Sequence, residues 1–190
     1  MKTIAVYPGT FDPITLGHLN ILEKAAAIFD EIILGVADFT GKNTFFDLAA
    51  RVQLCQEATA HLPNVKVQSF CGLVVDFTRS VGSKIMIRGM RAVSDFEYEL
   101  SLALTNEKLA DEIETIFLVP NLKYMYLSSS MIKQLASLGS DLRDYVPPCV
   151  ENALKNWKSD TAQPRAENMR GSDKQITTDQ QTIDAEKPRG

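Results

Sequence analysis

Five short apolar runs rich in β-branched residues alternate with helical patterns, and this alternation constrains the fold more than any other feature. The runs lie at 3–7, 31–37, 65–70, 84–88 and 113–119. Most of them lack the strict alternation of apolar and polar residues that marks a strand with one solvent-exposed face. They therefore predict strands covered on both sides. The pattern is typical of an α/β fold: a doubly wound, Rossmann-like, five-stranded parallel sheet with helices on both faces.

Helical spacing and cap residues set the expected helix boundaries. The expected helices cover 17–29, 47–62, 73–81, 94–109, 128–138 and 148–157. Their boundaries rest on cap and turn residues: Asp47 before the second helix, the S-x-x-E pair Ser94 and Glu97 before the fourth, Gly139 after the fifth, and Pro147 and Pro148 before the last, which ends near Trp157.

Composition divides the chain near residue 158. Residues 1–158 are expected to form one globular domain, whereas 159–190 contain no aromatic residue and few large aliphatic ones. A segment of this kind buries too little apolar surface to offset its ordering entropy. We therefore expect a disordered C-terminal tail at 159–190.

Charge and cysteine content narrow the functional classes. A formal net charge of −4 argues against non-specific nucleic-acid binding, which needs many cations. Three widely spaced cysteines favour free thiols over a disulfide framework or a zinc site. No run reaches the length of a membrane span, and Pro8 and Gly9 interrupt any signal-peptide core, so a cytoplasmic protein without membrane contact is expected.

The stretch YPGTFDPITLGH, residues 7–18, lies between the first expected strand and the first expected helix. Gly17 and His18 would place free backbone N–H groups and an imidazole at a helix N-terminus, which is an anion site. The alternative is a turn glycine followed by a surface histidine.

Cations and hydroxyls follow other expected strands. Arg88, Gly89 and Arg91 suit a polyphosphate, because arginine presents forked donors to phosphate oxygens, although a solvated charge cluster is the alternative. Ser128, Ser129, Ser130 and Lys133 open the fifth helix, and Lys42 follows the second strand, where it would otherwise be a surface lysine. These groups are expected to converge on one edge of the sheet.

The motifs TLGH at 15–18, RGMRAVSDFEYE at 88–99 and SSSMIK at 128–133 occur in this order. With them, the chain resembles the bacterial phosphopantetheine adenylyltransferases of the nucleotidyltransferase superfamily, over about 3–157. The resemblance implies a homohexamer that transfers AMP from ATP to 4′-phosphopantetheine with Mg²⁺, giving dephospho-coenzyme A and pyrophosphate. Coenzyme A would be a candidate feedback inhibitor.

Residue roles are carried over from the resemblance position by position. Thr10 and His18 would be catalytic, with His18 at the α-phosphate. The ATP-binding set would be Thr10, Phe11, His18, Gly89, Met90, Arg91, Glu99, Tyr124, Met125, Tyr126, Leu127, Ser128, Ser129 and Ser130. The acceptor-binding set would be Thr10, Lys42, Val74 and Arg88, with Tyr98 and Asn106 near the pantetheine arm.

Some positions depart from the family pattern. Asn43 and Thr44 replace a lysine and a proline after Lys42, and Ala49, Ala50 and Arg51 stand where E-E-R is usual. Lys133 replaces an arginine common in the superfamily, keeping the charge but losing the fork.

The implied reaction needs no general base, because a phosphate monoester with a second pKa of about 6 is largely dianionic near neutral pH. Catalysis would then consist of positioning and charge stabilisation. No protein-only metal cage is visible, so Mg²⁺ would be held mainly by phosphates and water. Two alternatives remain: a nucleotidyltransferase acting on another acceptor such as nicotinamide mononucleotide, and a non-catalytic nucleotide-binding module.

Overall fold

The computed structural model describes residues 2–38, 44–91 and 93–161, and five parallel strands form its single sheet. The strand order is β3-β2-β1-β4-β5. The strands are β1 (Ile4–Gly9), β2 (Glu31–Ala37), β3 (Val65–Phe70), β4 (Ile85–Gly89) and β5 (Glu114–Leu118). Every apolar run therefore forms a strand, and the predicted doubly wound sheet is confirmed.

Six α-helices and one 3-10 helix accompany these strands in the described part of the chain. They are α1 (Leu16–Ala26), α2 (Leu48–Thr59), α3 (Val74–Ser80), α4 (Val93–Leu109), η1 (Leu122–Tyr124), α5 (Ser129–Leu138) and α6 (Pro148–Thr161). Asp47 caps α2 through a 2.8 Å bond from the Ala50 amide, and Gly139 ends α5 in the left-handed region at φ 79°. Both cap predictions are confirmed.

Several helix boundaries differ from expectation, and α1 and α2 end three residues early, at Ala26 and Thr59. Helix α1 begins at Leu16 because Thr15, not the Gly17–His18 pair, starts it. Helix α4 begins at Val93, so Ser94 lies inside the helix and is not its N-cap. Helix α6 continues to Thr161, which places 159–161 in the helix, while 162–190 lie outside the described residues.

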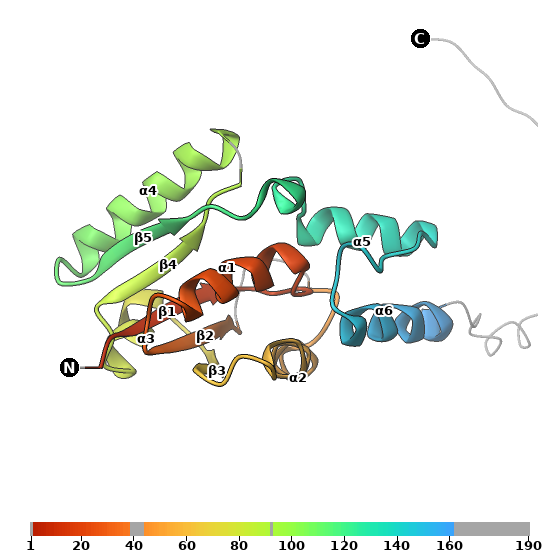
Figure 1. Cartoon of the computed structure of the whole chain (residues 1–190), viewed down its shortest axis with the longest axis horizontal. Helices are drawn as coiled ribbons and strands as arrows, with labels where there is room; N and C mark the ends of the chain where they lie inside the picture. Colours follow the sequence, from red (N-terminus) through yellow and green to blue (C-terminus); the bar gives the residue numbers. More distant parts are fainter. Residues whose placement is uncertain (1, 39–43, 92, 162–190) are drawn as a thin grey trace, which may run out of the picture.

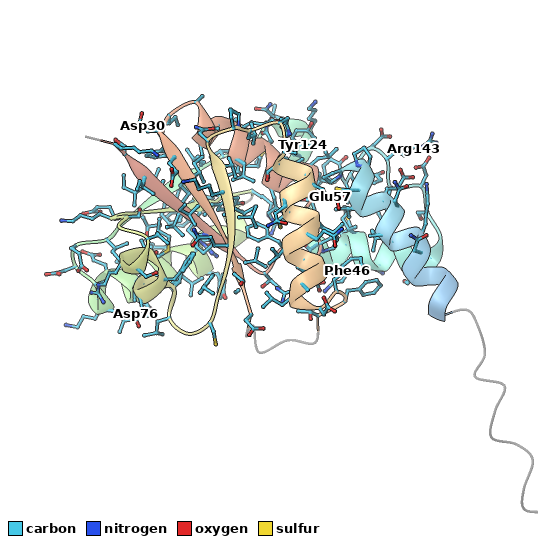
Figure 2. The ribbon with its side chains drawn as sticks, turned by 90° about the horizontal axis from the view of Figure 1, so that it is seen from below. Asp30, Phe46, Glu57, Asp76, Tyr124 and Arg143 are labelled. Atoms are coloured by element: carbon cyan, nitrogen blue, oxygen red, sulfur yellow. The ribbon has the colours of Figure 1, made fainter. Side chains whose placement is uncertain are left out.

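Strands β1 and β2 bury side chains on both faces, as their continuous apolar sequences require, whereas the edge strand β3 exposes Lys66, Gln68 and Ser69. Ala5, Ile32 and Leu34 join the main core with residues of α1, α2, α5 and α6. On the opposite face, Val6 and Ile33 pack with Phe77 of α3. Figure 1 shows α5 and α6 extending together from one side of the sheet, and Figure 2 shows α2 between β3 and α6.

The chain reverses its direction of strand addition between β1 and β4. Strands β2 and β3 are added on one side of β1, and β4 and β5 on the other. The register pairs β1 with β4 at Ala5↔Ile85 and Val6↔Met86, before either strand ends. The segments that follow these two strands therefore flank a crevice at the carboxyl edge, where ligands bind in such sheets.

The three thiols are free, as expected. Burial raises the pKa of the Cys55 thiol to about 12, and the pKa of Cys149 is also raised by burial, whereas Cys71 is exposed. No helix among the described residues is long and apolar enough to cross a membrane.

Truncation tests the expected domain boundary. A chain ending at residue 158 should keep its thermal midpoint within about 4 °C, because the removed segment offers little apolar surface. A chain ending at residue 150 should lose more, because it also removes Leu154, which is 3% exposed. Calorimetry and oligomer mass on both chains check this. A larger midpoint drop or a loss of mass at 158 would show that the tail docks on the body.

Candidate active site

A cavity of about 300 Å³ opens at the carboxyl ends of β1 and β4. The loop after β1, the first turn of α1, the end of β4 and the start of α5 surround it. Its lining comprises Tyr7, Pro8, Gly9, Thr10, Phe11, Asp12, Thr15, Gly17, His18, Ile21, Thr44, Arg88, Gly89, Arg91, Glu99, Pro120, Leu127, Ser128, Ser129, Ser130 and Lys133.

The structure brings most of the candidate residues together in this lining. Those present are Thr10, Phe11, His18, Arg88, Gly89, Arg91, Glu99, Leu127, Ser128, Ser129 and Ser130. Those outside the lining are Val74 at the start of α3, Met90, Tyr98 and Asn106 in α4, and Tyr124, Met125 and Tyr126 in or after η1. Lys42 lies outside the described residues.

Phe11 shapes the loop after β1. Its φ of 47° lies in the left-handed region, which is rare for a side chain of this size. The ring lies over Gly9, where a Cβ would approach Phe11 to 2.9 Å, so a larger residue at this position would displace the ring. The same ring packs edge-on against His18, with ring centroids 5.2 Å apart. Phe11 thus forms a wall between the loop and the first turn of α1.

Hydrogen bonds from Thr15 determine the tautomer of His18. The Thr15 backbone N–H donates to His18 Nδ1 at 3.1 Å, and an N–H group has no lone pair to offer in return. Nδ1 must therefore be unprotonated, and the ring proton lies on Nε2. Thr15 Oγ1 also lies 3.1 Å from Nδ1 and accepts from the His18 backbone N–H at 3.4 Å. One capping box thus starts α1 and orients the imidazole.

The surroundings of His18 keep its imidazole neutral. Burial, followed by the positive charges of Arg91 and Arg88, lowers the pKa of His18 from its ordinary 6.5 to about 4. A neutral Nε2–H is a hydrogen-bond donor near pH 7 that does not lose or gain a proton there. This suits a fixed donor to an anion rather than a proton-transfer group.

The cations of the lining are held by partners in the protein. Arg88 donates from Nε and Nη2 to the two carboxylate oxygens of Glu99 at 2.7 and 2.9 Å, and from Nη1 to the Pro8 carbonyl at 3.3 Å. Arg91 Nη1 donates to the Leu127 carbonyl. Glu99, expected to face ATP, therefore binds an arginine that was expected to face the acceptor.

Lys133 also has a carboxylate partner in the lining. Its Nζ lies 2.9 Å from Asp12 Oδ2. The lining thus holds three cations and two carboxylates, a formal excess of one positive charge. This excess is fixed in place and faces the cavity, as an anionic ligand requires.

The serines at the start of α5 have separate roles. Ser128 is the N-cap and accepts from the Met131 amide at 3.1 Å, as a capping serine should. Ser129 donates its hydroxyl to the Pro13 carbonyl at 2.9 Å and so ties α5 to the loop after β1. Ser130 is exposed in the cavity lining. The N-terminus of α5 therefore points free N–H groups toward the site.

Packing alone does not require glycine at position 17. A Cβ there would meet its nearest protein atoms, Thr15 Oγ1 and the Tyr124 carbonyl, at 3.5 Å, which is ordinary contact. Glycine in a helix costs about 1 kcal/mol relative to alanine. Its presence in the cavity lining is explained if a ligand occupies the space that a Cβ would take.

The described residues do not form a metal cage. They contain no group of three or more histidine, cysteine or carboxylate side chains that could hold an ion. The two carboxylates of the lining already bind Arg88 and Lys133. These residues therefore do not fit a resident metal ion.

Sequence reasoning missed three lining residues. The TLGH motif predicts no role for Thr15, yet this residue fixes His18. Asp12 accepts the Phe45 and Phe46 amides at 2.8 and 2.9 Å and binds Lys133. Burial raises the pKa of Tyr7 far above its ordinary value, so its phenol stays protonated beside Gly89. The only available signal for Asp12 was a carboxylate between the apolar residues Phe11 and Pro13.

Comparison with known proteins adds sequence evidence. The family model for cytidylyltransferase-like proteins matches residues 6–135. The chain belongs to the cytidylyltransferase-like family. A phosphopantetheine adenylyltransferase from Heliobacterium modesticaldum is 48% identical over 164 residues, covering 86% of this chain and 98% of the relative. The resemblance read from the motifs is thereby confirmed.

A solved structure supports the same fold at lower identity. A Vibrio parahaemolyticus protein assigned as a nicotinate-nucleotide adenylyltransferase superposes with a TM-score of 0.63 at 19% identity, covering 82% of this chain and 93% of that one. At this identity the likeness bears on the fold alone. The superposition shows that the two proteins share a similar arrangement of sheet and helices.

The tautomer assignment is testable in solution. In a ¹⁵N-histidine sample, His18 should show the neutral Nε2–H pattern from pH 5.5 to 8, because its pKa is lowered to about 4. The folded protein then binds fewer protons than the unfolded chain between pH 4 and 6.5, so the stability contributed by His18 should fall as the pH drops through this range. The second of the two histidines, His61, is exposed and serves as an internal reference. A His18 signal that titrates near pH 6.5 would contradict the assignment.

Proposed function

We propose that this chain is a phosphopantetheine adenylyltransferase: it transfers AMP from ATP to 4′-phosphopantetheine and releases dephospho-coenzyme A and pyrophosphate. The observation that carries the proposal is the 48% identity to a protein of that name over nearly the whole of both chains. The cavity supports it, because its fixed cations and neutral imidazole suit phosphate chemistry.

The reaction is a displacement at the α-phosphorus of ATP. A non-bridging oxygen of the acceptor phosphate forms a bond to this phosphorus, and the bond to the bridging oxygen of the β-phosphate breaks. The electron pair of that bond leaves with pyrophosphate. Because the acceptor phosphate is largely dianionic near neutral pH, no side chain must remove a proton.

The chain's contribution is to position two anions and stabilise the charge that develops between them. His18 donates from Nε2 to the α-phosphate oxygens, and Thr10 lies at the junction of the two substrates. Arg91 and the N-terminus of α5 hold the departing pyrophosphate. Arg88, oriented by Glu99, and Lys42 hold the acceptor phosphate. Mg²⁺ would arrive bound to the phosphates of ATP and would offset part of their negative charge, since the described residues form no metal cage.

Regulation and location follow from the same proposal. Coenzyme A contains the product's structure, so it should compete for the acceptor site as a feedback inhibitor. A cytoplasmic location fits an enzyme that draws on soluble ATP. Neither nucleic acid nor a membrane takes part in the proposed reaction.

Pyrophosphate release from ATP tests the proposal. Release should require 4′-phosphopantetheine and should not occur with nicotinamide mononucleotide or without an acceptor. His18→Ala should lower kcat by roughly 10²–10³, as loss of one oxyanion-type donor does, while the KM for ATP changes little. Turnover with nicotinamide mononucleotide would select the alternative acceptor, and ATP binding without turnover would indicate a binding module. Turnover of His18→Ala within threefold of wild type would give His18 a structural role.

We further propose a homohexamer, whose subunit number rests on the family resemblance. Support comes from α4, where Phe96, Leu100 and Leu104 follow one another at i, i+4 spacing and are 43, 36 and 56% exposed. An apolar stripe of this kind marks a contact surface.

Mass measurement tests the assembly. The wild-type particle should have six times the chain mass of 21.1 kDa. Leu104→Glu should reduce this mass, because it places a charge in the proposed contact. Ile28→Glu, at another exposed apolar residue (61% exposed), is the matched control and should leave the mass unchanged. A monomeric wild type would contradict the proposal.

A further inference from the structure

Arg51 has the largest of the fully buried side chains in the described part of the chain. The proposed mechanism gives it no role. Arg51 lies in the first turn of α2 and is 2% exposed. Its guanidinium donates three hydrogen bonds: Nε to the Phe46 carbonyl at 3.2 Å, and Nη1 to the Thr10 and Ala37 carbonyls at 2.8 Å each. Burying a charge is costly unless its donors are satisfied, and these three bonds offset that cost while satisfying three backbone carbonyls.

The three carbonyls belong to separate segments of the chain. Thr10 lies in the loop after β1, Ala37 ends β2, and Phe46 precedes α2. Figure 2 shows Phe46 at the N-terminal end of α2. A planar guanidinium donates along two edges in fixed directions, so its bonds set the relative positions of these segments.

Asp12 also connects the loop after β1 to the segment before α2. Its carboxylate accepts the Phe45 and Phe46 amides at 2.8 and 2.9 Å, while Arg51 binds the Phe46 carbonyl. The backbone of Phe46 is therefore held at both its N–H and its C=O. Lys133 of α5 holds Asp12 in turn at 2.9 Å. The loop after β1 is thus tied to α2 and to α5.

The position of Thr10 bears directly on the site. Its side chain lines the cavity, and the next residue, Phe11, forms the wall whose ring centroid lies 5.2 Å from that of His18. Arg51 itself does not line the cavity. A shift of the Thr10 peptide would move this wall relative to the imidazole without removing any group that meets a ligand.

We propose that Arg51 is a positioning residue for the transfer reaction: it holds the Thr10 peptide in place so that Thr10 and Phe11 keep their alignment with His18. The effect on turnover rests on the proposed function. The effect on the loop does not, and it can be measured without substrates.

The test compares Arg51→Lys with Leu54→Ala in the full-length chain. Lysine keeps the charge, but its single nitrogen cannot reproduce the planar arrangement of Nε and Nη1 that binds the three carbonyls. Leu54→Ala weakens the same helix at a buried residue (7% exposed) whose side chain makes no hydrogen bond. Arg51→Lys should lower kcat about 10–100-fold, as a misplacement of about 1 Å does, with both KM values within about threefold. Leu54→Ala should keep kcat within about threefold of wild type when assayed well below its midpoint.

Hydrogen exchange gives the readout that needs no activity. In Arg51→Lys, amides in peptides 9–14 and 44–47 should exchange at least tenfold faster than in wild type, on the order of losing one charged hydrogen bond. Amides of β2 from 31 to 36, which are paired within the sheet and make no bond to Arg51, should be unchanged. Leu54→Ala should not show this local pattern. Arg51→Gln, which leaves no buried charge, is the second variant if the lysine protein does not fold. It should show the same lower kcat and the same local increase in exchange relative to Leu54→Ala.

Two results would overturn the proposal. One is a kcat for the Arg51 variants no lower than that of Leu54→Ala. The other is exchange that is unchanged, or faster throughout the protein, instead of in the two peptides. If the wild type released no pyrophosphate with any acceptor, the proposed function would fail, and the exchange pattern alone would decide whether Arg51 fixes the loop.

Discussion

Peptide groups just beyond the carboxyl ends of β1 and β2 must find partners inside the protein, and two charged side chains provide them. An unsatisfied buried donor or acceptor costs about 1–3 kcal/mol, so losing these partners would weaken the packing of the loop after β1 and of the segment before α2 on the sheet edge. Asp12 accepts two amides and Arg51 donates to three carbonyls. The Phe11 wall, and with it the shape of the cavity, depends on this arrangement.

The start of α1 links folding to chemistry in the same way. A capping box satisfies backbone groups that every helix N-terminus leaves open. Here the second partner in the box is an imidazole rather than a glutamate, so the bonds that begin the helix also fix the ring proton on Nε2. A single local motif therefore sets both where α1 begins and which nitrogen of His18 is a donor.

Much of the fold could be predicted from the sequence because buried parallel strands and cap residues leave local signals. The five apolar runs, Asp47 and Gly139 are of this kind. The wrong prediction at Ser94 shows the limit of such local signals. A serine followed three residues later by a glutamate can occur inside a helix as well as at its start. For the site, motifs predicted which loops converge, but they did not predict that Glu99 pairs with Arg88. Arg51 stands at the arginine of the E-E-R pattern, but its role could not be predicted, because its partners are carbonyls, which every residue carries, one of them 41 positions away.

The Arg88–Glu99 pair also bears on how strongly a phosphate group can be held. A free arginine side chain carries about 2 kcal/mol of rotamer entropy, which a ligand must normally overcome when it orders the side chain. Three N–H groups of Arg88 are already engaged by Glu99 and Pro8. Most of that ordering has therefore occurred during folding, and a ligand phosphate meets a rigid, preoriented donor whose geometry discriminates by fit rather than by flexible adaptation.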